Sequence, residues 1–314
     1  MGRVTPTAPM LATAVDRLPT GVGWAYEFKW DGVRALIDVS EHGVVIRSRA
    51  GNDITAGYPE LVALASEDAG AGDALLDGEI VTFDPRTGRP SFELLQRRMH
   101  ARGPGLAKVA AEVPVTYVVF DIVRRYGVDL TARAYVERRA TLDRWVEQHP
   151  GWTISPFFDD GPATEAAARS HGLEGVVAKR LASTYHPGGR GPDWQKLRFL
   201  KTGDFVIIGW EASDEKPGVL SSLLLGVATP SGFEFAGKVG SGLDVTTARS
   251  LQRRLMVIAA PRAGVDRSPG RSGVWVEPEI VVEVAHSGVT GDRRLRQPVF
   301  LRVREDKLAT EATG

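Results

Sequence analysis

The chain has 314 residues, which is long for one domain and predicts about two domains of ordinary size. With 43% hydrophobic and 25% charged residues, and 39 basic side chains against 39 acidic ones, the sequence is typical of a globular protein, and no net charge attracts it to nucleic acid. It contains no cysteine, which excludes disulfides and thiol catalysis and is consistent with a reducing cytoplasm, and no apolar run approaches the roughly 18 residues of a membrane span.

The first two thirds of the chain mix short strands with helices. Helices are expected over 59–66, 134–147 and 163–169, and a basic helix is expected to run from an N-cap at Ser91 to residue 100. Apolar or alternating runs bounded by turns predict the strands, which are 24–29, 34–39, 44–47, 75–83, 115–123, 175–179 and 194–198. This mixture predicts an α+β domain over residues 1–203.

Beyond residue 203 the pattern changes to strands. These are expected at 205–211, 219–228 and 233–239, followed by a helix at 244–258 and a strand at 274–285. Residues 261–273 are rich in proline, glycine and arginine and are predicted to form a loop. The order strand, strand, strand, helix, strand is that of a five-stranded OB-fold barrel, so residues 204–314 are predicted to form an OB-fold domain.

The first motif with chemical meaning is KWDGVR at residues 29–34. Lys29 ends an expected strand and can present a primary amine to a phosphate, while Arg34 steadies that phosphate. Asp31 and Gly32 form the turn between them. A six-residue pattern of this kind also occurs in ordinary surface turns, so its meaning depends on the rest of the chain.

Further motifs follow in a fixed order. They are SRAG at 48–51, LDGE at 76–79, VFD at 119–121, EGVVAK at 174–179, WQKLR at 194–198 and REDK at 304–307. With them the chain resembles the covalent nucleotidyltransferase superfamily over residues 9–307. Within that superfamily it is most similar to the ATP-dependent DNA ligases of the bacterial ligase C group and to the ligase domain of ligase D.

The resemblance implies an adenylation (nucleotidyltransferase) domain followed by an OB-fold domain. It also implies a DNA ligase that moves AMP from ATP to a lysine, then to the 5′-phosphate of a nick, before the 3′-hydroxyl displaces AMP. ATP and Mg²⁺ (or Mn²⁺) would be the cofactors, and nicked duplex DNA the substrate. By the same resemblance the protein would act as a monomer in the bacterial cytoplasm, on the nucleoid, in DNA repair and recombination with proteins that process DNA ends.

The resemblance also implies roles for the residues that match each motif. Lys29 would be the nucleophile, and Glu79 and Glu174 would anchor the metal. The predicted nucleotide-binding residues are Glu27 and Phe120 at the base, Arg49 at the ribose, Arg34 at the phosphate and the nicked end, Glu79, and Lys179, Lys196 and Arg198 at the transferring phosphoryl group. Arg198 replaces the lysine that the family has at this position. Arg304 and Lys307 would orient the leaving pyrophosphate, and Asp31, Gly32 and Asp121 are further motif residues.

Simpler interpretations remain for several of these residues. Phe120 also fits a core aromatic, Glu79 an exposed turn acid, and Arg304 and Lys307 ordinary surface residues or phosphate contacts to DNA. Within enzymes, an RNA ligase or a capping guanylyltransferase shares the motifs. Outside enzymes, the chain could be a nucleic-acid binder that keeps the OB fold without turnover. The resemblance to ligase D favours DNA as the substrate, and the presence of every catalytic side chain named above argues against a binder that has lost turnover.

Overall fold

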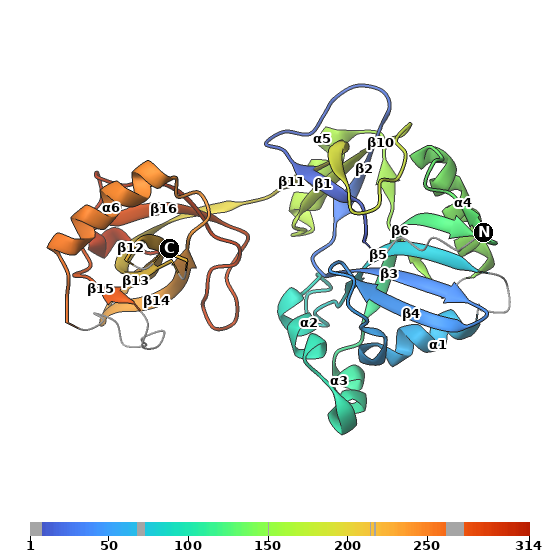
Figure 1. Cartoon of the computed structure of the whole chain (residues 1–314), viewed down its shortest axis with the longest axis horizontal. Coiled ribbons are helices and arrows are strands. Elements are labelled where there is room, and N and C mark those ends of the chain that lie inside the picture. Colours follow the sequence, from blue (N-terminus) through green and yellow to red (C-terminus); the bar gives the residue numbers. More distant parts are fainter. Residues whose placement is uncertain (1–7, 68–72, 150, 214, 217, 262–272) are drawn as a thin grey trace. The chain divides into compact units, whose positions relative to one another are not determined.

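The structure is a computed structural model, and it describes residues 8–67, 73–149, 151–213, 215–216, 218–261 and 273–314. The chain divides into two compact units, here called unit 1 (Met1–Phe199) and unit 2 (Leu200–Gly314) (Figure 1). The domain boundary predicted after residue 203 falls inside strand β12 (Lys201–Ala212), which runs through this point without a break. No helix within the described ranges is long and apolar enough to cross a membrane.

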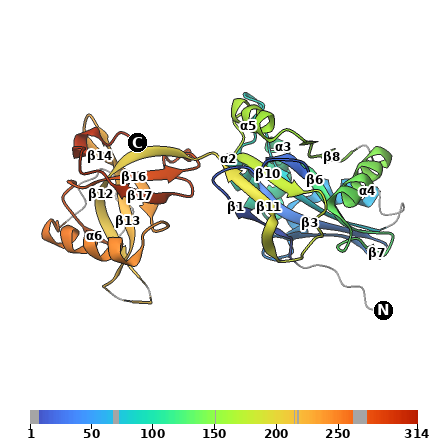
Figure 2. The same ribbon diagram turned by 90° about the horizontal axis from the view of Figure 1, so that it is seen from above.

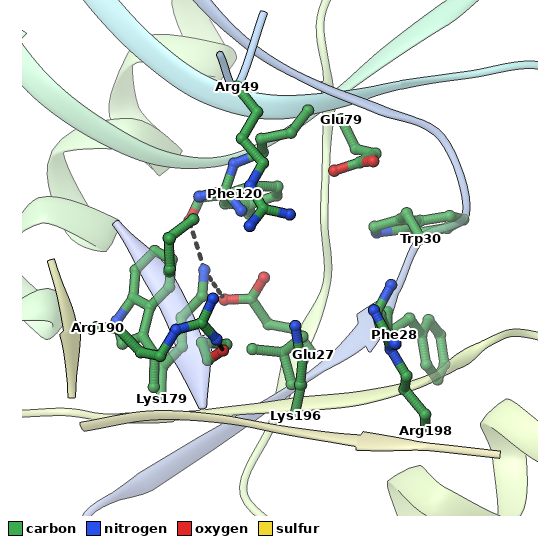
Figure 3. Close-up of a pocket in the computed structure, with 16 residues that line it drawn as sticks. Glu27, Phe28, Trp30, Arg49, Glu79, Phe120, Lys179, Arg190, Lys196 and Arg198 are labelled. Carbon is green, nitrogen blue, oxygen red and sulfur yellow. Dashed lines mark hydrogen bonds and ion pairs between the residues drawn. The ribbon is translucent and has the colours of Figure 1, made fainter. Parts of the chain in front are cut away.

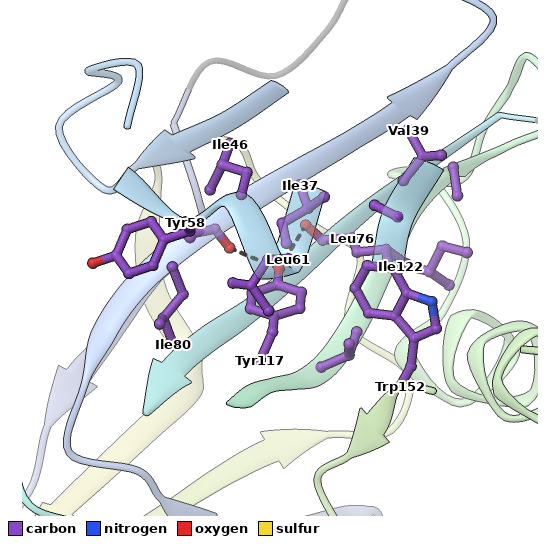
Figure 4. Packing of buried hydrophobic residues seen from close by; sticks show 14 of the residues in the cluster. Ile37, Val39, Ile46, Tyr58, Leu61, Leu76, Ile80, Tyr117, Ile122 and Trp152 are labelled. Carbon is purple, nitrogen blue, oxygen red and sulfur yellow. Dashed lines mark hydrogen bonds between the residues drawn. The ribbon is translucent and has the colours of Figure 1, made fainter. Parts of the chain in front are cut away.

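The first sheet of unit 1 carries the main hydrophobic core. Its strands, in spatial order, are β4 (Gly43–Ser48), β3 (Val33–Ser40), β5 (Ala74–Val81), β6 (Thr116–Arg125) and β7 (Val128–Asp129), and β8 (Thr153–Ile154) pairs with β6. Alternate side chains of a strand point to opposite faces. One face packs against α1 (Pro59–Glu67) and α4 (Tyr135–Gln148) through buried residues that include Ile37, Leu76 and Tyr117 (Figure 4). The Tyr117 hydroxyl group donates to the carbonyl oxygens of Ala35 and Leu76, which ties three strands together.

The second sheet of unit 1 holds most of the remaining motifs. Its spatial order is β1 (Leu11–Ala14), β11 (Arg190–Arg198), β10 (Gly175–Arg180), β2 (Trp24–Lys29) and β9 (Phe157–Phe158), with α5 (Gly161–Ser170) packed on β10 and β2 (Figure 2). Between the two sheets lies a smaller buried cluster, in which Leu36, Leu75 and Phe120 from the first sheet meet Trp194 from the second. The second face of the first sheet is therefore covered as well.

Two short helices complete unit 1. Helix α2 (Phe92–Met99) begins as predicted at Ser91, whose hydroxyl oxygen accepts a hydrogen bond from the backbone N–H of Leu94. Helix α3 (Leu106–Glu112) was not predicted. It has only 7 residues and none of its side chains is fully buried, so its apolar pattern is shorter than the window of roughly 11 to 18 residues from which a helix is recognised in a sequence. Single 3-10 turns lie at Thr55–Gly57, Gly103–Gly105 and Ala309–Glu311, the last of them in unit 2.

Unit 2 is built on one sheet. Strands β12, β13 (Leu220–Thr229) and β14 (Gly232–Val239) form a meander, after which α6 (Val245–Val257) leads to β16 (Val281–His286) and β17 (Val299–Val303). The spatial order is β14, β13, β12, β16, β17, so the chain returns after the helix to pair with the first strand of the meander. Helix α6 begins at Asp244, whose side chain accepts from the N–H groups of Thr246 and Thr247. This arrangement matches the strand order expected of an OB fold.

The prediction of one continuous strand at 274–285 was wrong. This segment consists of β15 (Val274–Trp275), which pairs with β12, and β16, with residues 276–280 between them. Pro278 lies in this interval, and proline cannot donate a hydrogen bond to a neighbouring strand. Strand β17 was not predicted as a strand. Most of the loop predicted at 261–273 lies outside the described residues.

Candidate active site

Unit 1 contains a pocket of about 150 Å³ between its two sheets (Figure 3). Most of the predicted site residues of unit 1 line it, namely Glu27, Lys29, Arg34, Arg49, Glu79, Phe120, Lys179, Lys196 and Arg198. Pockets that bury a drug-sized ligand usually exceed about 300 Å³. This one can therefore enclose part of a nucleotide, such as its base, while the phosphates extend toward solvent.

The local fold explains why motifs far apart in the sequence meet here. In the second sheet, Gly175 pairs with Lys29, and Lys179 pairs with both Ala25 and Trp194. The turn after Lys29 then packs directly on the first sheet. A Cβ atom on Gly32 would lie 2.1 Å from the carbonyl oxygen of Ile80, so only glycine fits at this point. The requirement for glycine in the motif is thus a close approach of the turn to strand β5, the neighbour of β3 in the first sheet.

One end of the pocket, here called the deep end, is buried and aromatic. The Lys179 ammonium lies 2.6 Å from Glu27 Oε1, and both side chains are almost fully buried. The same ammonium lies 4.4 Å from the ring centroids of Phe120 and Trp194. Burial lowers the pKa of Lys179, and the Glu27 carboxylate opposes this shift. The Tyr135 hydroxyl also donates to Glu27, so the acid is held by two partners.

Arg34 is bound to the protein rather than free in the pocket. Its Nε and Nη2 atoms lie 2.6 and 2.7 Å from the two carboxylate oxygens of Asp77, which also accepts from the Tyr185 hydroxyl. Burial would lower the pKa of Arg34, but the Asp77 carboxylate more than reverses this, and the guanidinium stays charged. The Cζ atom of the Arg34 guanidinium lies 4.4 Å from the Phe120 ring centroid. Since Arg34 and Lys179 both lie over Phe120, an adenine can stack on this ring only beside or in place of one of these cations.

The other end of the pocket, here called the open end, carries excess positive charge. Lys29 donates to Glu174, and the other oxygen of Glu174 lies 3.4 Å from Arg198 Nε. Burial, and then the charges of Arg198, Lys29 and other cations, lower the pKa of Lys196 to about 8. Cations that lie this close repel one another. An anion such as a phosphate would relieve that repulsion.

Glu79 is the second acid of the open end. Burial raises its pKa to about 7, the charges of Arg34 and Lys29 oppose the rise, and the charge of Glu174 adds to it. Among the residues that the structure describes, none donates a hydrogen bond to oxygen Oε1 of Glu174. Carboxylate oxygens, together with phosphates and water, are ligands that Mg²⁺ prefers. Glu79 and Glu174 therefore fit a divalent cation, although no group of three or more acidic or histidine ligands gathers in the part of the chain described here.

The remaining predicted residues lie elsewhere. Asp31 lies in the turn after Lys29, beside Gly32. Asp121 is fully buried, and its two carboxylate oxygens each accept a hydrogen bond from Arg138 at 2.8 Å. It lies on the face of β6 opposite the pocket, because successive side chains of a strand alternate and the neighbouring Phe120 faces the pocket. Asp121 therefore anchors α4 and does not line the pocket.

Arg304 and Lys307 lie in unit 2, where they are paired with acids of the same unit. Arg304 lies 2.8 Å from both Asp204 and Asp306, and Lys307 Nζ lies 2.7 Å from Asp204. Hydrogen bonding to Asp306 and the charge of Asp204 raise the pKa of Arg304, which stays charged. In unit 2 these two basic residues, here called the basic pair, are neutralised by their own neighbours.

Some pocket residues carried no predicted role. Trp194 stands in a quoted motif, and its alternation with Lys196 along β11 could have indicated that both face the pocket. Asp77 does not line the pocket but holds Arg34 there; it also stands in a motif, and an acid inside an apolar strand requires a buried partner. Arg190 follows a Pro-Gly-Gly run with no recognisable pattern, and no signal in the sequence identifies it.

Comparison with known proteins agrees with this geometry. The family model described as "ATP dependent DNA ligase domain" matches residues 9–198, and "ATP dependent DNA ligase C terminal region" matches residues 216–307. The chain belongs to the ATP-dependent DNA ligase family. The predicted fold class is thereby confirmed, with an adenylation domain followed by a C-terminal OB-fold domain.

Two relatives show how far the similarity to other members of this DNA ligase family extends. The multifunctional non-homologous end joining protein LigD of Mycobacterium bovis is 36% identical over 311 residues, which cover 97% of this chain and 39% of LigD. A probable DNA ligase of Streptomyces avermitilis is 35% identical over 325 residues, covering 98% of this chain and 62% of that protein. The chain thus spans about two fifths of the length of the curated LigD relatives.

Solved structures of the family cover the chain almost completely. A mycobacterial DNA ligase D complexed with ATP and MES has 35% identity and a TM-score of 0.59, and covers 98% of this chain and 97% of its own. The ligase domain of Mycobacterium tuberculosis LigD has 35% identity and a TM-score of 0.57, with 98% of each chain covered. The match therefore extends over both units.

Proposed function

We propose that this chain is an ATP-dependent DNA ligase that seals nicks in duplex DNA through AMP carried on Lys29. The observation that carries the proposal is the position of Lys29. It lies at the open end of a pocket whose deep end is aromatic and whose open end gathers cations and two carboxylates. A nucleotide bound with its base in the deep end would place its phosphates beside Lys29.

The first step is transfer of AMP to the protein. The Lys29 amine gives up a proton, its nitrogen bonds to the α-phosphorus of ATP, and the bond to pyrophosphate breaks. Glu174 already accepts a hydrogen bond from this amine and would orient it. Lys196 and Arg198 would stabilise the charge on the transferring phosphoryl group, which is mainly an electrostatic task.

The next two steps use DNA. The 5′-phosphate of the nick displaces Lys29 from AMP, and the 3′-hydroxyl then attacks that activated phosphate, forming the phosphodiester and releasing AMP. The same cations at the open end would stabilise the transition states of both steps, because each step again places negative charge on a phosphoryl group. We assign Arg34, whose guanidinium is fixed in the pocket wall by Asp77, to the phosphate and the nicked end, and Arg49 to the ribose.

Mg²⁺ fits this site through Glu79 and Glu174. When bound, the ion would offset negative charge on the phosphates. Glu79 and Glu174 would hold the ion, and Glu174 also accepts the hydrogen bond that orients the Lys29 amine.

At the deep end we assign Glu27 and Phe120 to adenine. Lys179 was predicted at the transferring phosphoryl group, but its ammonium is buried against Glu27, so we assign it to the deep end instead. The names of the relatives refer to non-homologous end joining, and on that basis we propose a role in DNA repair together with proteins that process broken ends. Nicked duplex DNA is the substrate under this proposal.

Incubation with α-labelled ATP or GTP and Mg²⁺, followed by a nick-sealing assay on DNA and RNA, tests the proposal. A ligase gives an acid-stable labelled band with ATP and seals the DNA nick. Labelling with GTP alone would identify a guanylyltransferase, and sealing of RNA alone an RNA ligase. Binding of nucleic acid without any labelling would show that the chain is a binding protein.

A further inference from the structure

A row of aromatic side chains extends from the open end of the pocket. It consists of Phe158, Phe28, Trp30 and Phe83, and is called the aromatic row below. Consecutive ring centroids are 5.4, 6.2 and 6.4 Å apart, so each ring contacts the next. Phe28 and Trp30 flank Lys29 in the sequence and line the pocket.

The ends of the aromatic row are exposed. Phe158 is 39% and Phe83 37% accessible to solvent, and neither side chain belongs to a hydrophobic core. Single exposed apolar residues are common on protein surfaces, but a connected set of aromatic rings is typical of a binding surface. The row is also held in place, because Trp30 Nε1 donates to the Ser155 hydroxyl oxygen at 3.0 Å.

The position of the aromatic row narrows what can bind it. Figure 3 shows Phe28 and Trp30 beside Arg198 and on the opposite side of the pocket from Lys179. The row therefore starts where the excess positive charge lies. Under the proposed function, the 5′-phosphate of a nick must reach Lys29 at this end, and the nucleotides attached to that phosphate must lie against the residues that border it.

We propose that the aromatic row is a contact surface for the sugars and bases of the nucleotides beside the nick. This inference rests on the proposed function. Aromatic rings pack against deoxyribose and bases without sequence preference, whereas the neighbouring cations contact phosphates. The two kinds of contact lie next to each other here, as the phosphates lie next to the sugars and bases in a nucleotide chain. The row would hold the DNA strand in place while the open end performs the chemistry.

The test uses the full chain with Phe158→Ala, Phe83→Ala and the double variant. Tyr126→Ala is the matched control, because Tyr126 is 63% exposed, belongs to the same unit and lies in the turn between β6 and β7, outside the row. We expect Lys29 labelling by ATP without DNA to stay within about twofold of the parent. The KM for a pre-adenylylated nick should rise about tenfold in the double variant, in line with the loss of stacking on aromatic side chains. Phe158→Tyr with Phe83→Trp should restore it.

A direct measurement of DNA binding distinguishes a failure of this proposal from a failure of the proposed function. Anisotropy of a labelled nicked duplex reports on the row even if the parent protein seals nothing. Weaker DNA binding in the double variant, with binding by Tyr126→Ala unchanged and the unfolding midpoint preserved, supports the proposal. Unchanged DNA binding and KM in the double variant would overturn it, as would an equal loss of labelling and sealing, which would indicate a damaged pocket. Absence of labelling in the parent protein would contradict the ligase assignment alone.

Discussion

The pocket of unit 1 and the basic pair of unit 2 both gather cations, but the protein neutralises them in different ways. In the pocket, Lys179 is buried among aromatic rings with one carboxylate, and at the open end Lys196 has its pKa lowered by neighbouring cations. In unit 2, Arg304 and Lys307 are satisfied by Asp204 and Asp306. The pocket is thus arranged in advance for an anion, whereas the basic pair must exchange its partners to act on one.

The largest effect is expected at the deep end. Lys179→Met removes one partner of a buried ion pair and leaves the Glu27 carboxylate uncompensated, which should lower the free energy of unfolding by about 3–5 kcal/mol. Denaturant unfolding of the variant, with Lys29→Met as control, measures this. Lys29→Met should cost much less, because Lys29 lies at the open end. The double variant Glu27→Gln, Lys179→Met should recover part of the lost free energy of unfolding. If Lys179→Met lowers the free energy of unfolding by less than about 1 kcal/mol, the ion pair is not structurally important.

The next effect concerns the basic pair. If Arg304 and Lys307 orient pyrophosphate, Arg304→Ala with Lys307→Ala should slow formation of the Lys29 adduct about a hundredfold, the loss typical for removing a donor at developing charge. Sealing of a pre-adenylylated nick should change little. Arg302→Ala is the control, since Arg302 is exposed and pairs with Glu283 nearby. Equal loss in both half-reactions would indicate DNA binding or misfolding instead.

A smaller effect is expected from Phe120. Because this residue is buried with Leu36 and Leu75, Phe120→Ala would damage the core as well as the ligand site, and Phe120→Leu separates the two roles. Loss of stacking should weaken ATP binding by about 0.5–1.5 kcal/mol, or up to roughly tenfold. Calorimetric titration with ATP measures this. If Phe120→Leu binds ATP like the parent protein, Phe120 serves the core alone.

The smallest effect is expected in the pH dependence of the adenylylation rate, which is set by two titrating groups at the pocket. The pKa of Lys196 is lowered to about 8, so its positive charge is present below pH 8 and is lost above it. The pKa of Glu79 is raised to about 7, so its negative charge is lost below pH 7. Adenylylation should therefore fall severalfold on either side of this window. Lys196→Arg stays charged, and the ratio of parent to variant rates should decline above pH 8. A constant ratio would contradict the assignment.

Much of the fold could be predicted because the relevant signals are local. The strand before Lys29 and the Ser91 cap are readable from neighbouring residues, whereas the roles of the motif residues were implied by the resemblance to a known family. Pairs that depend on sheet register were missed, such as Arg34 with Asp77, since the sequence does not show which residues of different strands face each other. The burial of Lys179 was missed for the same reason. The interruption at Pro278 was missed because the apolar run around it resembles one strand.

The central claim is that Lys29 carries AMP, and peptide mapping of the labelled protein tests it most directly. After incubation with α-labelled ATP and Mg²⁺, the parent protein should hold the label on the peptide that contains Lys29 and on no other. Lys29→Ala should show no label and no ATP-driven sealing, yet should still join a pre-adenylylated nick. Near-normal labelling of Lys29→Ala, or a label mapped to Lys179 or Lys196, would contradict the account.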